Sequence, residues 1–207
     1  MIEHFIYDFD GTLSDSYPVF LQILKEIMAR YGGTTTCSDE ALYRKMKDRV
    51  VEAYHAVEWQ SDVSKDLFFD DFVAAQDARY AEFQLFPDAE RLLRAVVESG
   101  KKNYLYTHSG KPVYRIMEKM GISQYFTYVL DATQGFPSKP EPDALLSLID
   151  RFDLDPQTCI MIGDRPIDVQ AGANAGMQSC LFDPDGFFPN TPATYHVDGL
   201  AEILKLI

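Results

Sequence analysis

The sequence predicts an α/β protein, a doubly wound parallel sheet (a Rossmann-like core) with an inserted α-helical cap. Short apolar runs of strand length alternate with amphipathic stretches along most of the 207 residues, as in βαβ units. One long segment, residues 15–84, contains helical patterns and no convincing strand. We therefore expect a core domain of residues 1–14 and 85–207, with residues 15–84 forming a helical domain inserted after the first strand.

The amino-terminal part predicts one strand followed by helices. Residues 3–9 form a short apolar run of strand length. From about Ser16 an apolar residue recurs at every fourth position, which predicts a helix, and the glycine pair at 32–33 ends it. Two or three further helices are expected between residues 38 and 84, one of them phenylalanine-rich around residues 67–83.

After residue 87 the pattern alternates regularly. Glycines at positions 100, 121 and 176 end helical stretches, and the apolar run at 159–162 is typical of a strand that is buried on both faces. Ligands of such sheets bind beyond the carboxyl ends of the strands. The expected elements are helix 87–100, strand 104–106, helix 112–120, strand 128–130, helix 144–152, strand 159–162, helix 167–175, a last strand 179–182, and helix 201–206.

Composition and charge indicate which kinds of partner the protein is expected to lack. The formal net charge is −13, and no cluster of Lys and Arg suits a nucleic-acid backbone, so we expect no nucleic-acid partner. There is no basic leader and no long apolar segment, so neither a signal peptide nor a membrane partner is expected. Three widely spaced cysteines favour a reducing, cytoplasmic location. No coiled-coil pattern or unusual apolar stripe distinguishes a monomer from a homodimer.

Four carboxylates follow two of the predicted strands. Asp8 and Asp10 end the first strand, and Asp164 and Asp168 come directly after the run 159–162. Each alone is also explained as a turn or helix-capping residue. Gathered at neighbouring strand ends, however, they would repel one another unless a cation lay between them. Oxygen ligands with room for water and phosphate suit Mg²⁺.

Two other predicted strands end in groups that could meet an anion. Thr107 and His108 precede a helix, where a hydroxyl and backbone N–H groups make a modest anion site. Lys139 lies in a proline-rich loop, PSKPEP, which is stiff enough to fix the reach of its ammonium group. Taken singly, a helix cap and an exposed loop lysine are the commoner explanations of these residues.

The ordered set of motifs is far more specific than its parts. DFDGTLSDS, YTHSG, SKPEP and GDRPIDVQAGANAG resemble the four signature motifs of the haloacid dehalogenase superfamily, in that family's order and each at a predicted strand end. The resemblance covers residues 3–16 and roughly 85–183, and the motifs are most similar to those of phosphoglycolate phosphatase-like enzymes. It implies a phosphoric monoester hydrolase that acts on a small-molecule phosphate.

The resemblance also implies a role for each matching position. Asp8 would be the nucleophile that forms an aspartyl-phosphate, and Asp10 the general acid and base. Mg²⁺ would bind Asp8, the main-chain carbonyl of Asp10 and Asp164, with Asp168 as a further ligand or an orienting residue. Thr107 and the amide of His108 would hold phosphoryl oxygens, and Lys139 would neutralise the charge on Asp8 and on the transferring group. Arg165 would either touch the substrate or brace Asp168.

The inserted helical segment resembles the C1 cap of this family in its place after the first motif. A cap of this kind closes over small substrates, so it is expected to set specificity, and Arg49, Lys45 and Lys47 are its candidate substrate contacts. For each of these three residues taken singly, a solvated helix face is the commoner explanation. Three other functions stay open: a phosphomutase of the same superfamily, a phosphonate hydrolase of the kind that uses a Schiff-base lysine in the cap (here Lys45, Lys47 or Lys65), and a non-catalytic binding protein that keeps the fold.

Overall fold

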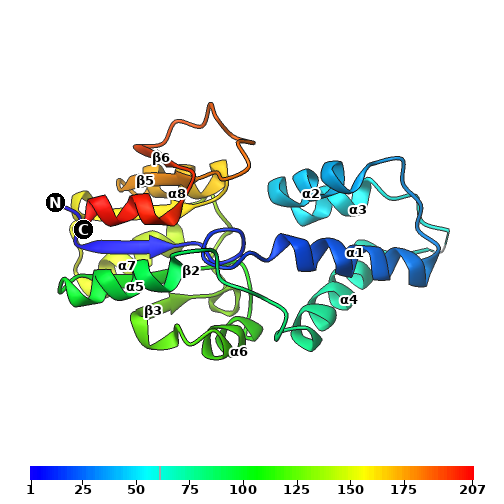
Figure 1. Cartoon of the computed structure of the whole chain (residues 1–207), viewed down its shortest axis with the longest axis horizontal. Coiled ribbons are helices and arrows are strands. Elements are labelled where there is room, and N and C mark those ends of the chain that lie inside the picture. The colour runs from blue at the N-terminus through cyan, green and yellow to red at the C-terminus, as the bar shows by residue number, and fades with distance from the viewer. Residues whose placement is uncertain (61) are drawn as a thin grey trace. The chain divides into compact units, whose positions relative to one another are not determined.

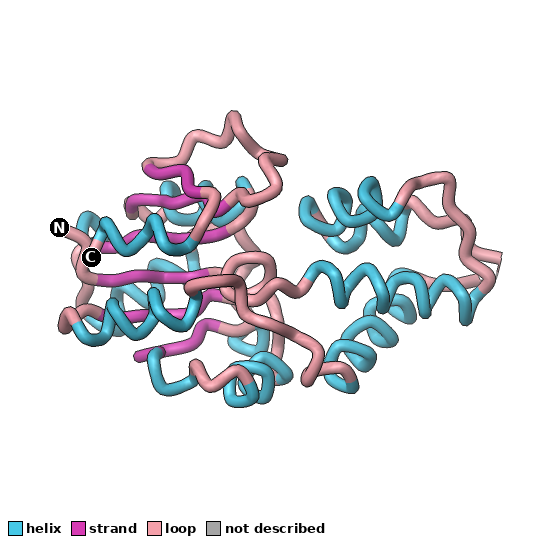
Figure 2. Tube along the Cα trace, viewed as in Figure 1, coloured by secondary structure: helices cyan, strands magenta, loops and turns pink. Residues whose placement is uncertain are grey.

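The computed structural model describes residues 1–60 and 62–207, and these fall into two compact units. The first unit comprises Met1–Ser14 and Leu85–Ile207, and the second comprises Asp15–Gln84. Figure 2 shows every strand in the first unit, whereas the second consists of helices and loops. The doubly wound α/β fold expected from the sequence is confirmed.

The core of the first unit is a parallel sheet whose strand order is β3-β2-β1-β4-β5-β6 (Figure 1). This order places β1 in the centre. The chain adds strands to one side of β1 first and then, from β4 on, to the other side, and doubly wound sheets bind ligands at this switch point between β1 and β4. Tyr7 at the end of β1 pairs with Leu105 on one side and Ile162 on the other. The residues that follow these three strands therefore meet at one edge. The strands are β1 His4–Tyr7, β2 Lys102–Tyr106, β3 Phe126–Leu130, β4 Cys159–Gly163, β5 Gln178–Phe182 and β6 Tyr195–Val197.

Helices cover both faces of the sheet. Figure 1 shows α5 and the 3₁₀ helix Leu200–Leu206 on the near face, with α7 and α8 behind the sheet. Behind the sheet, Ile6 and Met161 pack with Leu145 of α7 and Ala171 of α8 in one buried cluster. Burial of such side chains is the main stabilising term of the fold. The helices are α5 Ala89–Glu98, α6 Pro112–Lys119, α7 Asp143–Phe152 and α8 Pro166–Asn174.

Two expectations at the carboxyl-terminal end were wrong. The run at 179–182 is a strand but not the last one, because β6 pairs with β5 through Cys180 and Tyr195. With three residues, β6 is too short to show a period of its own. The helix expected at 201–206 is a 3₁₀ helix, whose tighter turn a pattern of six residues does not distinguish.

The second unit contains four helices in its described part: α1 Tyr17–Tyr31, α2 Asp39–Asp48, α3 Val50–His55 and α4 Lys65–Ala78. Its interior is aromatic: the ring centroids of Phe20 and Phe72 lie 5.4 Å apart, and those of Tyr54 and Phe68 lie 5.1 Å apart. The phenylalanine-rich stretch therefore supplies core packing for this unit. No described helix of the chain has both the length and the apolarity needed to span a membrane.

Candidate active site

Asp8 is held at the carboxyl end of the central strand. Its N–H donates to the carbonyl of Ile162 at 2.8 Å, which continues the pairing of β1 with β4 by one residue. Gly11 then turns the chain with a φ of 83°, a conformation that L side chains rarely adopt. The carbonyl of Phe9 accepts hydrogen bonds from the N–H groups of Leu13 and Ser14. The turn is thus closed, and Asp8 just before it is buried, 2% exposed.

Lys139 reaches this strand end from a distant loop. Its Nζ donates to Asp8 Oδ1 at 2.8 Å, to Asp168 Oδ1 at 2.7 Å and to the carbonyl of Tyr106 at 3.0 Å. Burial alone would lower the pKa of Lys139, but the neighbouring carboxylates of Asp168 and Asp8 raise it above its ordinary value. The buried side chain is therefore a charged ammonium that uses all three of its donors.

Three carboxylates form one cluster beside this ammonium. Asp8, Asp164 and Asp168 each offer an oxygen, and these atoms lie within 4.8 Å of one another. Asp168 lies in the first turn of α8, and its Oδ2 accepts from the N–H of Arg165 at 3.1 Å. Gly163 permits this approach, since a Cβ at position 163 would lie 2.2 Å from the Cβ of Asp168. The end of β4 is therefore shaped to bring Asp168 close.

The guanidinium of Arg165 approaches all three of these carboxylates. Its Nη2 lies 3.7 Å from Asp8 Oδ2, and its Nε lies 3.9 Å from Asp164 Oδ1 and 3.8 Å from Asp168 Oδ2. These are ion-pair distances, longer than hydrogen bonds. With Lys139, Arg165 brings the formal charge of the five groups to −3 + 2 = −1.

The donor set fits a hard divalent cation. It consists of carboxylate oxygens only, which Mg²⁺ prefers over nitrogen or sulfur ligands. Asp8 Oδ2 is buried and makes no hydrogen bond to any described residue. A buried carboxylate oxygen without a donor is costly, and a cation would remove that cost. Asp8, Asp164 and Asp168 are thus suitable ligands for Mg²⁺.

Thr107, His108 and Ser109 lie at the end of β2. The N–H of Thr107 continues the sheet by donating to Leu130, and its Oγ1 accepts from the N–H of Ser109 at 3.0 Å. The hydroxyl of Ser109 donates to Asp10 Oδ2 at 2.8 Å. Ser109 therefore fixes the second aspartate of the first motif. The motif YTHSG contains this serine, but nothing in the sequence indicates that its side chain reaches Asp10.

The imidazole of His108 makes an unexpected contact with the lysine loop. Its Nε2 accepts a hydrogen bond from the backbone N–H of Lys139 at 3.2 Å, so this nitrogen carries no proton. Part of the ring remains solvent-accessible, but burial of the rest, followed by the charges of Lys139 and Arg165, lowers the pKa of His108 to about 3. The expected role of His108 concerned its amide; the structure adds a neutral side chain that holds the Lys139 backbone.

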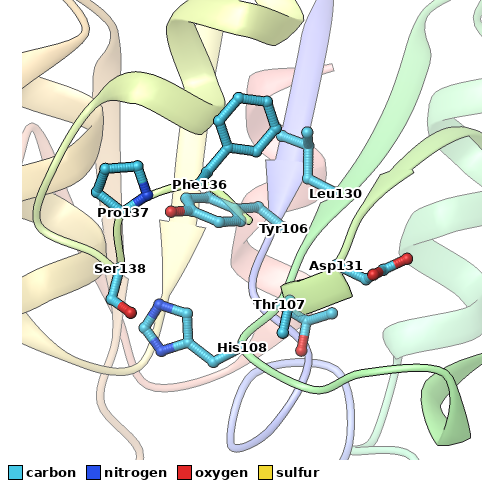
Figure 3. A pocket seen from close by; sticks show the side chains of 9 residues that line it. Tyr106, Thr107, His108, Leu130, Asp131, Phe136, Pro137 and Ser138 are labelled. Atoms are coloured by element: carbon cyan, nitrogen blue, oxygen red, sulfur yellow. The ribbon is translucent and has the colours of Figure 1, made fainter. Parts of the chain in front are cut away.

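A cavity of about 120 Å³ opens beside the ends of β2 and β3 (Figure 3). Tyr106, Leu130, Phe136 and Pro137 form the apolar part of its wall, and Thr107, His108, Asp131 and Ser138 the polar part. The hydroxyl of Tyr106 is buried and makes no hydrogen bond to a described residue. A cavity of this volume has room for water.

The structure thus brings four of the expected residues together: Asp8, Lys139, Asp164 and Asp168. Asp10 is turned to Ser109 and is not one of the three clustered carboxylates. Arg49 belongs to the second unit, between α2 and α3, where it pairs with Glu52 at 2.9 Å and its side chain is 65% exposed.

A doubly wound parallel sheet with clustered carboxylates and a buried lysine at its central strand ends defines an enzyme core of the Rossmann-like class. A family model described as haloacid dehalogenase-like hydrolase matches residues 5–182. The chain belongs to this family.

Several relatives carry names of phosphatases. The chain is 29% identical to a phosphoglycolate phosphatase of Vibrio parahaemolyticus, over 97% of this chain and 94% of that protein. It is also 29% identical to mitochondrial (DL)-glycerol-3-phosphatase 1 of Arabidopsis thaliana, over 89% of this chain, but it spans only 64% of that protein. The crystal structure of a predicted phosphoglycolate phosphatase from Haemophilus somnus superposes with a TM-score of 0.85 at 21% identity, covering 99% and 97% of the two chains. This last likeness concerns the fold.

Proposed function

We propose that this hydrolase removes the phosphoryl group from a small organic phosphate monoester through an aspartyl-phosphate on Asp8. The observation that carries the proposal is the buried contact of Lys139 with Asp8 at 2.8 Å, inside a cluster of three carboxylates. A lysine fixed against a buried aspartate holds that carboxylate in place, as a nucleophile requires. The phosphatase names of the relatives support the same reaction.

The chain supplies the groups for both half-reactions. In the first, an Asp8 carboxylate oxygen bonds to phosphorus, the P–O bond to the leaving alcohol breaks, and Asp10 gives a proton to the departing oxygen. In the second, Asp10 takes a proton from water, the water oxygen bonds to phosphorus, and the Asp8–phosphorus bond breaks. The hydrogen bond from Ser109 orients Asp10 for both transfers. Lys139 offsets negative charge on Asp8 and on the transferring group.

Mg²⁺ held by Asp8, Asp164 and Asp168, with the main-chain carbonyl of Asp10, would supply positive charge that neutralises the phosphoryl oxygens. Thr107 and the amide of His108 are proposed to bind those oxygens. Thr107 Oγ1 accepts from the N–H of Ser109 through a lone pair, which leaves the hydroxyl hydrogen to be donated toward an anion.

Substrate choice is assigned to the second unit, which we take as a C1 cap. Its insertion directly after the first motif, between Ser14 and Leu85, supports this view. Arg49 is the cap residue proposed to contact a substrate carboxylate or hydroxyl, and its pairing with Glu52 is exposed enough to exchange. Cytoplasmic small phosphates are the proposed substrate pool.

The test is turnover of p-nitrophenyl phosphate by the native chain and by Asp8→Asn, with Mg²⁺ or with EDTA. We expect Asp8→Asn to lose at least about 10³-fold in kcat, since nucleophile removal is among the largest single effects in enzymes. Asp153→Asn is the matched control, because exposed Asp153 has a φ of 51°, which asparagine also tolerates. Activity that survives EDTA or the Asp8 change would refute the mechanism. With a sugar phosphate as substrate in place of p-nitrophenyl phosphate, release of free phosphate and not of an isomer separates the reaction from that of a mutase.

A further inference from the structure

The side chain of Arg165 faces the cluster in a way that the proposed reaction does not use. Its two nearest nitrogens lie 3.7 to 3.9 Å from oxygens of Asp8, Asp164 and Asp168, and the side chain is only 13% exposed. These are the three residues that the proposed function assigns to Mg²⁺. The positively charged Arg165 and the expected metal ion would therefore both interact with the same three carboxylates.

Bracing of Asp168 does not require this side chain. The backbone N–H of Arg165 already donates to Asp168 Oδ2 at 3.1 Å, and any residue other than proline would supply that donor. The side chain instead lies 3.7 to 3.9 Å from one oxygen of each carboxylate. At these distances the charges attract each other, but the groups are too far apart for hydrogen bonds. A guanidinium stays charged at any working pH, so this attraction is always present.

Arg165 reduces the net negative charge of the buried cluster. With Lys139 alone the three carboxylates leave a formal charge of −3 + 1 = −2 in a buried site, and Arg165 reduces it to −1. Uncompensated buried charge is strongly destabilising. Arg165 thus stabilises the cluster when no metal is bound, and a dication at the same carboxylates would be repelled by it.

From this we infer that Arg165 is a built-in counter-cation that competes with Mg²⁺ and sets the affinity of the site for it. The inference rests on the proposed metal site. Because both cations gain from the same carboxylates and repel each other, each weakens the other's interaction by an equal factor. The arginine stabilises the metal-free protein and makes metal binding weaker and more readily reversible.

The experiment is calorimetric titration of the metal-free chain with Mg²⁺ in the absence of substrate. We expect Arg165→Gln to bind Mg²⁺ about tenfold more tightly than the native chain, within the usual range of coupling between two sites. Arg165→Lys, which keeps the positive charge, should stay nearer to native affinity. The matched control is Arg94→Gln, which makes the same change in net charge at an exposed position on α5 and should leave the affinity unchanged.

Thermal unfolding gives a second readout that does not depend on activity. In EDTA, Arg165→Gln should melt at a lower temperature than the native chain and Arg94→Gln, and saturating Mg²⁺ should raise its melting temperature by a larger margin. Equal Mg²⁺ affinity in the native and Arg165→Gln chains overturns the inference alone. Weaker affinity in Arg165→Gln overturns it too and, with a raised KM, assigns the arginine to the phosphoryl group. Failure of both chains to bind Mg²⁺ overturns the proposed metal site itself.

Discussion

The side chain of Lys139 makes three hydrogen bonds within the site. Its ammonium contacts Asp8, Asp168 and a β2 carbonyl. Lys139→Met therefore removes the positive charge beside the proposed nucleophile and leaves two buried carboxylates without that partner. We expect kcat to fall at least about 100-fold, as for other preorganised electrostatic groups. The free energy of unfolding in EDTA should fall by roughly 3 kcal/mol. Steady-state kinetics and urea denaturation measure the two effects, with Lys205→Met, a 78% exposed lysine, as control. Native-like kinetics in Lys139→Met would remove the lysine from the mechanism.

His108 makes stability depend on pH. Unfolded, it takes a proton near pH 6.5, but the folded ring has a pKa of about 3, so between these values the unfolded chain binds more protons. Stability therefore rises with pH across this window and is lost as pH falls through it. His108→Asn cannot titrate, so its melting temperature should drop less than the native one between pH 7 and pH 5. An equal drop in both chains would show that the ring does not stay neutral.

Some residues of the site could be expected from the sequence and others could not. Asp8, Lys139 and Asp164 follow strands, and parallel strand ends share an edge, so topology alone brings them near one another. The direction of a side chain is not encoded in spacing. Hence the contact of Ser109 with Asp10, and that of His108 with Lys139, emerged only with the fold.

At the scale of elements, the junction of β4 and α8 decides the shape of the carboxylate cluster. An added Cβ at Gly163 would lie 2.2 Å from the Cβ of Asp168, a distance that backbone or side chain must relieve. Gly163→Ala is expected to lower the free energy of unfolding by roughly 2 kcal/mol, as overpacking does, and to weaken Mg²⁺ binding by displacing Asp168. Urea denaturation and calorimetry measure these effects. Gly199→Ala, where an added Cβ meets nothing within 4 Å, should match the native chain. Native stability in Gly163→Ala would contradict the close fit.

The elements themselves were predictable in proportion to their length and burial. The strand at 159–162 is apolar throughout and lies between two neighbours, so composition alone indicated it. β6 was missed because three residues at the sheet edge owe their conformation to pairing with β5. The helix Leu200–Leu206 is a 3₁₀ helix, which is wound more tightly than an α-helix, and the residue pattern of this segment does not distinguish the two.

At the scale of the whole molecule, the proposed catalytic groups other than Arg49 belong to one unit, which the chain leaves and re-enters at adjacent points. Ser14 and Leu85 form an antiparallel bridge, and the N–H of Phe86 donates to the carbonyl of Leu13 at 2.9 Å. A short Gly-Ser linker could therefore replace residues 15–84 at little cost in loop entropy.

We expect this shortened chain to unfold cooperatively, because its sheet and the buried cluster behind it lie wholly within the retained residues. It should still bind Mg²⁺, since Asp8, Asp164 and Asp168 are all retained. If residues 15–84 set specificity, its kcat/KM values for different phosphate monoesters should converge, while the native chain keeps them apart. Circular dichroism, calorimetry and a substrate panel measure the three outcomes. A shortened chain that folds and still discriminates as the native one does would move substrate choice from the helical unit to the core itself.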